Sequence, residues 1–517
     1  MRFKILLAIT LVLLVATIAM AQRNNRRGNR NRGNNRNNGN RNNGRGNRGN
    51  RNNGRGNPGN GNSGNQYKSI DCLSEKQRET LQNRFSAASM AAICERYNHW
   101  MHLMAGKQKQ SLRPSSLNSG MQDMEQRIAD ILHKPLKPHE ATSSKKSKPR
   151  PRKEYRTLTV DERNRYHNGI NVLKNFRIGG TNIYDFLADY HQPHIVPGAH
   201  WGAAFLPWHK QYLLMMERLL QIIDPTIMIP YWDSTLDSHL GDQAANSVMW
   251  SSEFMGNRFG DVTTGPFAGW TVPRPTEGKY TLWRGNGSIG RMTTDEDFDY
   301  ITGVDNYRNL TWHVDPYLEM VHGMPHLWTG GPMGTITAAA FDPLFYTHHA
   351  FIDLMWDTQR DRVYREVGRE DYEYPGLDDD EVYGVGKVQD PFAETPLIID
   401  QGSESAHYPP KQLYPFPKKN EDSLDEEYKS VYYYKRRPSC SRRRQNCRSP
   451  YLFCVAGIYK CAPKLVDGAD CSNFTSSVDP CYKGRCKDGR CEGVSDSDNY
   501  LNQFMRYLFT LFQPNFN

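Results

Sequence analysis

The chain has 517 residues, which is long enough for two or three domains and a large buried core. Its formal net charge is +10, but residues 23–65 contain 11 Arg and no acidic residue. Setting aside these 11 and the two cations of residues 1–21 leaves 53 of the 66 Lys and Arg against 56 Asp and Glu, so the remainder is slightly acidic. A nucleic acid is therefore not the expected partner. The basic segment favours an acidic extracellular matrix or a mineral.

Residues 1–21 are typical of a secretory signal peptide. Arg2 and Lys4 precede an apolar run, and the small residues Ala19 and Ala21 flank a plausible cleavage site. No other run approaches the roughly 20 apolar residues that a membrane-spanning helix needs. We therefore expect a secreted protein, soluble or bound to an extracellular matrix, with no membrane partner. Three N-x-S/T sequons are compatible with a glycoprotein: Asn286, Asn309 and Asn473.

The next segment, residues 22–66, is composed almost entirely of Asn, Arg and Gly, with "RNNGRGN" recurring and no aromatic residue before Tyr67. Such a composition cannot bury enough apolar surface to fold, so it predicts a disordered tail. A solvated linker and an adhesive arm both fit. Residues 67–154 predict a helical extension that ends in a basic linker, because apolar residues repeat at three and four. Cys72 and Cys94 could join its elements.

Residues 155–400 predict one large, mainly helical domain with long Gly/Pro-rich loops, followed by a linker at 401–439. Residues 440–492 hold eight of the ten cysteines, which predicts a small disulfide-rich module. Eight cysteines allow 105 pairings, so the connectivity stays open, and a zinc ribbon is disfavoured because CxxC pairs are missing. Residues 493–517 form a C-terminal tail that could contain a short amphipathic helix.

Ten of the 16 histidines lie between residues 191 and 349, and eight of these ten form two clusters. A lone histidine is usually structural, whereas two clusters among apolar and aromatic residues indicate metal binding. The clusters contain His191, His194, His200 and His209, and then His322, His326, His348 and His349.

His322 and His326 are four residues apart, so on a helix they share one face and can hold one ion. A zinc protease would have Glu after the first histidine, as in HExxH, where this chain has Gly323. The lack of nearby Cys favours an all-imidazole site, which suits copper or zinc, with copper preferred on intrinsic affinity. The adjacent His348 and His349 point about 100° apart on a helix, so they cannot easily serve one ion together.

Three stretches carry a resemblance to a known family: "AHWGAAFLPWHKQYLLMMERLL", "VHGMPHLWTGGPM" and "DPLFYTHHAFIDLMW". Together with "PYWD" at 230–233 and the eight residues between His200 and His209, they resemble the type-3 copper proteins, namely tyrosinases, catechol oxidases and haemocyanins. The resemblance covers roughly residues 155–400. It implies a four-helix bundle core that binds two copper ions and uses O2, with no further catalytic residue and no organic cofactor. The additional segments resemble those of secreted molluscan tyrosinase-like shell matrix proteins.

The resemblance also implies a role for individual residues. The first copper (A) would be held by His191, His200 and His209, with His194 as the alternative to His191, and the second (B) by His322, His326 and His349. Pocket or surrounding positions would be Phe205, Phe345, His348, Gly323 and Leu327, together with Asp353, which would orient an imidazole or bond a neighbour.

The implied reaction is oxidation of o-diphenols, as small molecules or protein side chains, to o-quinones that cross-link or pigment a matrix such as shell. Many phenol-hydroxylating relatives have Asn where this chain has Gly323, and the position often implicated in tuning activity is the bulky Leu327. We therefore expect diphenol oxidation and leave monophenol hydroxylation open. A haemocyanin-like oxygen carrier and a non-catalytic matrix protein are the alternatives. Residues 405–517 are a candidate cover for the pocket.

Overall fold

The computed structural model describes residues 72–107, 148–178, 181–193, 199–285, 288–367, 423 and 428–493. All described residues belong to Gln66–Asn517, one of the two units into which the chain divides. The predicted signal peptide and Asn/Arg/Gly tail lie outside the described residues, as do residues 494–517.

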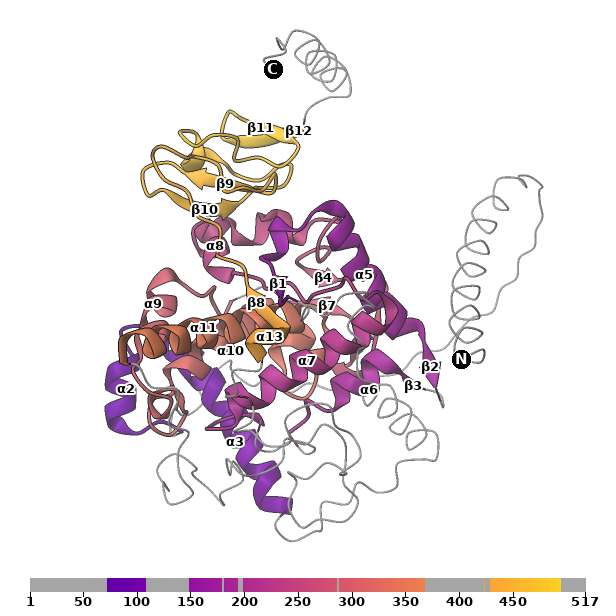
Figure 1. Cartoon of the computed structure of the whole chain (residues 1–517), viewed down its shortest axis with the longest axis vertical. Coiled ribbons are helices and arrows are strands. Elements are labelled where there is room, and N and C mark those ends of the chain that lie inside the picture. Colours follow the sequence, from indigo (N-terminus) through magenta and orange to yellow (C-terminus); the bar gives the residue numbers. More distant parts are fainter. Residues whose placement is uncertain are drawn as a thin grey trace, which may run out of the picture. The chain divides into compact units, whose positions relative to one another are not determined.

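Helices dominate the described residues (Figure 1). The helix α7 (Phe205–Ile223) packs against α5 (Val160–Asn175) and α11 (Leu344–Val367), and α9 (Asp295–Gly303) packs against α11 and α10 (Tyr317–Thr329). Strands within the described residues form only two-stranded sheets. The predicted mainly helical fold is confirmed. None of the described helices is long and apolar enough to span a membrane.

The sequence explains why two of these helices form where they do. The helix α7 is apolar almost throughout, and 16 of its 19 residues are buried, so it is the central helix of the core. The helix α5 begins with a capping box, in which Thr159 accepts the amide N–H of Glu162 while the Glu162 carboxylate accepts the amide N–H of Thr159.

The connections between the core helices contain only short elements. These are η1 (Tyr155–Thr157), β2 (Arg177–Ile178), β3 (Thr181–Asn182), α6 (Ile183–Asp189), α8 (Ser234–Ser238), η3 (Gly241–Asn246), η4 (Val248–Trp250), β4 (Gly260–Asp261), β5 (Thr271–Thr276), β6 (Lys279–Thr281), β7 (Trp283–Arg284), η5 (Arg308–Leu310), η6 (Gly331–Gly334) and η7 (Ala339–Phe341). Within them β2 pairs with β3, β4 with β7 and β5 with β6, all antiparallel. Long loops between helices are what the Gly- and Pro-rich stretches predict.

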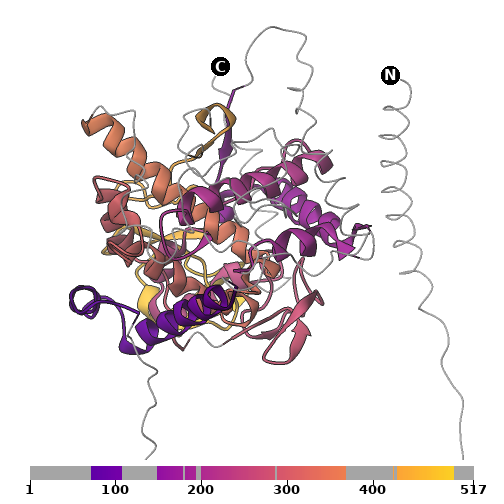
Figure 2. The same ribbon diagram turned by 90° about the horizontal axis from the view of Figure 1, so that it is seen from below.

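The N-terminal extension contributes α2 (Glu75–Leu81) and α3 (Ala87–Lys107). The disulfide Cys72–Cys94 joins them, as the spacing of these cysteines allowed. The helix α3 packs against α10, and Figure 2 shows it in indigo in front of the core. We call the stretch 75–107 the α2–α3 segment.

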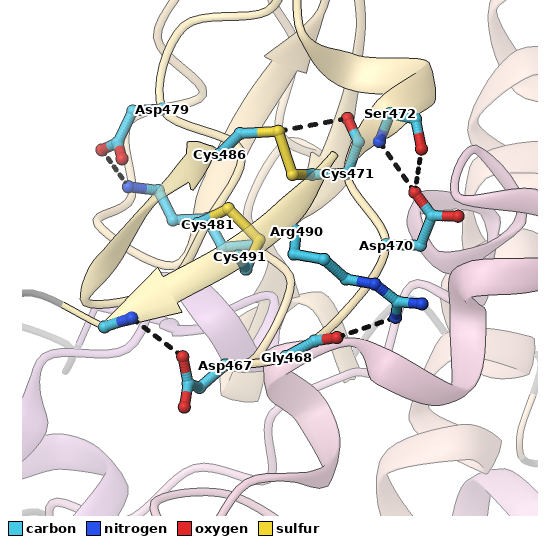
Figure 3. The surroundings of a disulfide bond; sticks show 12 residues. Asp467, Gly468, Asp470, Cys471, Ser472, Asp479, Cys481, Cys486, Arg490 and Cys491 are labelled. Atoms are coloured by element: carbon cyan, nitrogen blue, oxygen red, sulfur yellow. Dashed lines mark hydrogen bonds and ion pairs between the residues drawn. A yellow bond between two sulfur atoms is a disulfide. The ribbon is translucent and has the colours of Figure 1, made fainter. Parts of the chain in front are cut away.

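The C-terminal part consists of α13 (Tyr428–Val431), β8 (Tyr432–Tyr434) and a Cys-rich module of two hairpins, β9–β10 (Leu452–Val455, Lys460–Pro463) and β11–β12 (Gly484–Lys487, Arg490–Gly493), with η10 (Ser472–Phe474) between them. The four disulfides of the module pair Cys440–Cys454, Cys447–Cys461, Cys471–Cys486 and Cys481–Cys491, the last two drawn in Figure 3. The predicted disulfide-rich module is confirmed, and all ten cysteines of the chain are paired.

The two strands that flank the large helical region in the sequence pair with each other. The strand β1 (Arg150–Arg152) pairs in parallel with β8, so residues 282 positions apart lie side by side. Arg152 is fully buried there, and its guanidinium lies 3.7 Å from the centre of the Tyr432 ring. The core therefore begins and ends at neighbouring strands.

Candidate metal centre

The first histidine cluster comes from three different local structures. His191 follows the end of α6, His200 lies in the loop before α7, and His209 lies one turn into α7. All three are buried, their ligand nitrogens lie within 4.8 Å of one another, and Nε2 of His200 lies 2.9 Å from Nε2 of His191. His194 lies outside the described residues. The structure thus brings together the three residues proposed for copper A.

The second cluster lies on two helices. His322 and His326 are one turn apart on α10, and His349 lies on α11. Nε2 of His349 is 3.2 Å from Nε2 of His322 and 3.3 Å from Nε2 of His326. Nitrogens that bind one ion at about 2.0 Å lie roughly 3 Å apart, so this spacing fits a shared metal ion.

Backbone carbonyls orient two of these imidazoles. Nδ1 of His209 lies 2.7 Å from the carbonyl oxygen of Phe205, and Nδ1 of His326 lies 2.9 Å from that of Met333. A proton on Nδ1 leaves the Nε2 lone pair available for a metal. Nε2 of His209 is buried and has no hydrogen-bond partner within the described chain, which is the state expected of a ligand atom whose partner is an ion.

The adjacent pair His348 and His349 serves two purposes. Nε2 of His349 points at Nε2 of His322 and of His326, whereas Nε2 of His348 lies 3.0 Å from the carbonyl oxygen of His322. The His348 ring is fully buried and stacks on the ring of His322, with centroids 5.4 Å apart. His348 therefore links α11 to α10 and is not one of the three residues whose ligand nitrogens converge, which agrees with the 100° turn between neighbouring helical residues.

The six imidazoles are neutral. Burial lowers the pKa of each, and a neighbouring group adds to the shift: His326 for His209, whose pKa falls to about 3, and Arg96 for His326, whose pKa falls to about 4. Backbone hydrogen bonds oppose the shift at both residues. The same causes hold the pKa of the other four well below the ordinary value. Neutral imidazole is the form that binds copper, so the donor set fits two copper ions.

The two clusters face each other. The rings of His209 and His349 are stacked, with centroids 4.3 Å apart and planes at 11°. Phe205 contacts His209 and His322, each with centroids 4.8 Å apart, while Phe345 contacts His349 at 4.1 Å and His191 at 4.6 Å. Each phenylalanine thus touches both clusters, which gives the pair an apolar surrounding.

Asp353 binds neighbours other than the imidazoles. Its carboxylate accepts hydrogen bonds from Tyr432 at 2.8 Å and Tyr434 at 2.6 Å, and it forms ion pairs with Lys210 at 2.9 Å and Arg152 at 3.3 Å. Burial alone would raise the pKa of Asp353, but Lys210 and Arg152 outweigh it and lower the pKa. Asp353 therefore ties α11 to α7 and to the strand pair β1–β8.

Glu319 is a buried residue at the site that the sequence analysis did not find. Its carboxylate accepts the amide N–H groups of Trp201 at 2.7 Å and Gly202 at 2.8 Å, directly after His200. Burial raises the pKa of Glu319 to about 8, although these hydrogen bonds oppose the shift. Because Glu319 lies three residues before His322 on α10, it links the loop of one cluster to the helix of the other. Its spacing from His322 is the signal that could have identified it.

Beside the clusters lies a cavity of about 50 Å³. Its lining includes His191, His200, His322 and His326, together with Glu319, Gly323, Ile93 and Arg96. Leu327 is buried on α10 but does not line it, and neither do the described residues of the C-terminal part. The expected cover from residues 405–517 is therefore not seen within residues 423 and 428–493. The wall opposite α10 comes from α3.

Comparison with known proteins identifies the core. Residues 181–362 match the family model described as the common central domain of tyrosinase. A putative tyrosinase-like protein of Caenorhabditis elegans is 35% identical over 67% of this chain and 48% of its own length. A tyrosinase-like protein of Pinctada maxima is 34% identical over 44% of the chain and 53% of its own length, so the chain spans about half the length of these relatives. Tyrosinase of Streptomyces lincolnensis is 31% identical, with 40% of this chain and 80% of that protein aligned.

Among solved structures, a polyphenol oxidase of Thermothelomyces thermophila aligns with a TM-score of 0.44 and 20% identity, covering 63% of this chain and all of that one. Members of the tyrosinase family hold a dinuclear copper centre that uses O2, which confirms the predicted cofactors. The match over the histidine-bearing region and the extent of the bacterial alignment together establish that this chain belongs to the tyrosinase family.

Proposed function

We propose that the protein is a secreted, copper-dependent phenol oxidase that converts o-diphenols to o-quinones. Two diphenols and one O2 would give two quinones and two waters, so each diphenol loses two electrons and two protons. The observation that carries the proposal is the pair of buried histidine clusters stacked face to face through His209 and His349. The donor set contains only neutral imidazoles, which suits copper.

In this proposal His191, His200 and His209 hold one copper ion, and His322, His326 and His349 hold the other. The bound copper pair supplies the redox chemistry and the activation of O2. The carbonyl groups of Phe205 and Met333 orient ligands, and the rings of Phe205 and Phe345 keep water from the ligand nitrogens. The protein thus contributes position, burial and neutral ligands.

We expect diphenols to be better substrates than monophenols. Hydroxylation of a monophenol requires that its phenol proton be removed first, and Gly323, which follows His322, has no side chain to hold a water or accept a proton. A diphenol loses its first proton more easily and needs no new oxygen atom. Gly323→Asn would therefore raise the rate on tyrosine relative to the rate on an o-diphenol.

The decisive experiment is metal analysis and assay of the copper-loaded full-length chain, with the α2–α3 segment both in place and released by proteolysis. Two copper ions per chain and quinone formed from an o-diphenol would support the enzyme. Two copper ions with no quinone in either state would favour an oxygen carrier. Less than one copper ion after incubation with excess metal would favour a non-catalytic matrix protein.

We further propose that the quinones cross-link or pigment an extracellular matrix to which the basic tail binds. Tyrosinase-like proteins of Pinctada maxima and Margaritifera margaritifera are similar to this chain, and the 11 Arg of residues 23–65 suit an acidic polymer or mineral. Deleting residues 23–65 should spare diphenol turnover and reduce retention on an acidic matrix. Equal retention would show that the tail is only a linker.

A further inference from the structure

The cavity beside the histidine clusters is too small for a phenol. One water needs about 10–15 Å³ of such volume, so about 50 Å³ holds a few waters or O2. Binding pockets for organic ligands usually measure roughly 300–1,000 Å³. In the described structure the site is therefore accessible only to small molecules.

Ile93 of α3 is the side chain that limits this cavity. It is 2% exposed, and a methyl group built on Gly323 would lie 2.5 Å from its Cδ1 atom. Gly323 follows His322 on α10, so Ile93 lies directly against the helix that carries two of the proposed ligands. This aliphatic side chain therefore fills the space beside Gly323 at the wall of the cavity.

The α2–α3 segment is docked by a mixture of polar and aromatic contacts. Nε of Arg96 donates to the carbonyl oxygen of Gly334 at 3.0 Å. The ring of Tyr97 stacks on Trp312 with centroids 5.6 Å apart and meets Trp201, the neighbour of His200, edge-on at 5.8 Å. These contacts bring the segment over both ligand-bearing regions.

No disulfide ties the segment to the rest of the protein. Cys72–Cys94 closes within the N-terminal extension, and the other four disulfides all lie in the Cys-rich module. The covalent path from α3 to the core is the peptide chain through residues 108–147. Lys145 and Lys146 in that stretch offer a cleavage site to a trypsin-like protease. After one cut, only non-covalent contacts would hold the segment in place.

We propose that the α2–α3 segment is an inhibitory cover, and that Ile93 is the residue that bars phenols from the copper pair. Release of the segment, by cleavage within residues 108–147, opens the site to phenols while small ligands reach it throughout. This inference rests on the proposed phenol oxidase function and specifies how access to that same site is controlled.

Binding to the zinc-loaded protein tests the cover without any turnover, because zinc accepts imidazole ligands and undergoes no redox change. The probe is 4-nitrocatechol, followed by its absorbance. Ile93→Ala should bind it at least about tenfold more tightly than the unmodified chain, a difference of roughly 1.4 kcal/mol. Ile170→Ala, which removes the same atoms from a fully buried position of α5, should bind like the unmodified chain. Equal binding by the unmodified chain and Ile93→Ala would overturn the proposal.

A second experiment uses the copper-loaded protein with a recognition site for a specific protease placed within residues 108–147. Diphenol turnover should rise at least about tenfold after cleavage, while affinity for azide, a small anion, should stay the same. Equal turnover before and after cleavage would overturn the proposal of an inhibitory cover, but not the proposed phenol oxidase function. If cleaved protein with two copper ions forms no quinone, the phenol oxidase function fails, whereas the zinc experiment still decides on the cover.

Discussion

Two disulfide-bonded segments flank the helical core, and they differ in what they touch. The α2–α3 segment reaches the cavity beside the histidines through Ile93 and Arg96. The Cys-rich module instead packs against α8, and the amide N–H of Val466 donates to the carbonyl of Asn246, at the end of η3, at 2.9 Å. Both lie outside the matched tyrosinase region, residues 181–362. A segment added to an enzyme core can affect the reaction only if it docks beside the site. Disulfide bonds within the segment do not by themselves give it that effect.

Removing a proposed copper ligand should lower diphenol turnover more than any change in the two flanking segments. His349→Ala removes one proposed ligand of copper B and should lower diphenol turnover more than about 100-fold, with one copper ion lost. His348→Ala removes the contact to the His322 carbonyl and the ring stacking on His322, but no proposed ligand, and should retain both ions. Copper analysis and initial rates check this pair. The opposite result would reverse the assignment of the two adjacent histidines.

Removing one disulfide from each flanking segment separates their roles. Cys72→Ser with Cys94→Ser should weaken the docked α2–α3 segment, since a disulfide typically contributes about 2–4 kcal/mol, and should raise diphenol turnover. Cys471→Ser with Cys486→Ser loosens a loop of similar length in the module and should leave turnover unchanged. Initial rates and limited proteolysis with mass spectrometry measure both effects. An equal rise in diphenol turnover in both variants would contradict the different roles assigned to the two segments.

A methyl group added at Gly323 on α10 tests the contact between α10 and Ile93 of the α2–α3 segment. Gly323→Ala forces Ile93 away and should weaken docking of α3 by about 1 kcal/mol, while Ile93→Ala in the same chain restores the space. Hydrogen exchange of the α3 amides should therefore be faster in Gly323→Ala and recover in the double variant. Additive effects would contradict a direct contact, and copper content serves as the control.

His239 makes docking of the module dependent on pH. Its Nδ1 lies 2.7 Å from the carbonyl oxygen of Cys461 and its Nε2 lies 3.0 Å from the Asp295 carboxylate. Burial lowers the pKa of His239, but the hydrogen bonds to Asp295 and Cys461 outweigh it and raise the pKa above the ordinary 6.5.

A folded-state pKa above the unfolded value stabilises the protein fully below about pH 6.5, and this stabilisation is lost as pH rises through the raised pKa. The free energy of unfolding should therefore fall as the pH rises through that range. His239→Gln should remove the dependence, as measured by thermal unfolding at several pH values. Turnover by the core site should not follow the same curve.

The sequence predicted the parts of the site that local spacing defines. The HxxxH pair of α10 and the 100° turn within His348–His349 were readable because helical geometry is regular. The role of α3 was not readable. Ile93 and Gly323 are 230 positions apart, and nothing in the residues around either one indicates the contact.

The disulfide connectivity could not be predicted for a similar reason. Cysteine spacing allows many disulfide connectivities, and the fold selects one of them. Cys454 lies opposite Cys461 in one hairpin, and Cys486 lies opposite Cys491 in the other. Each of these four cysteines nevertheless bonds a cysteine outside its own hairpin. Glu319 was missed because a carboxylate three residues from a histidine is common on helices. Its role became clear only from the hydrogen bonds that its carboxylate accepts from two backbone N–H groups.

The parallel pairing of β1 with β8 has a consequence for how such proteins diversify. Because Arg150–Arg152 lie beside Tyr432–Tyr434, the polypeptide enters and leaves the helical core at one spot. A unit whose ends adjoin can be transplanted into a loop of another protein, or have its ends rejoined elsewhere, with little disturbance. New N- and C-terminal segments can therefore be exchanged over generations while the six histidines stay in register.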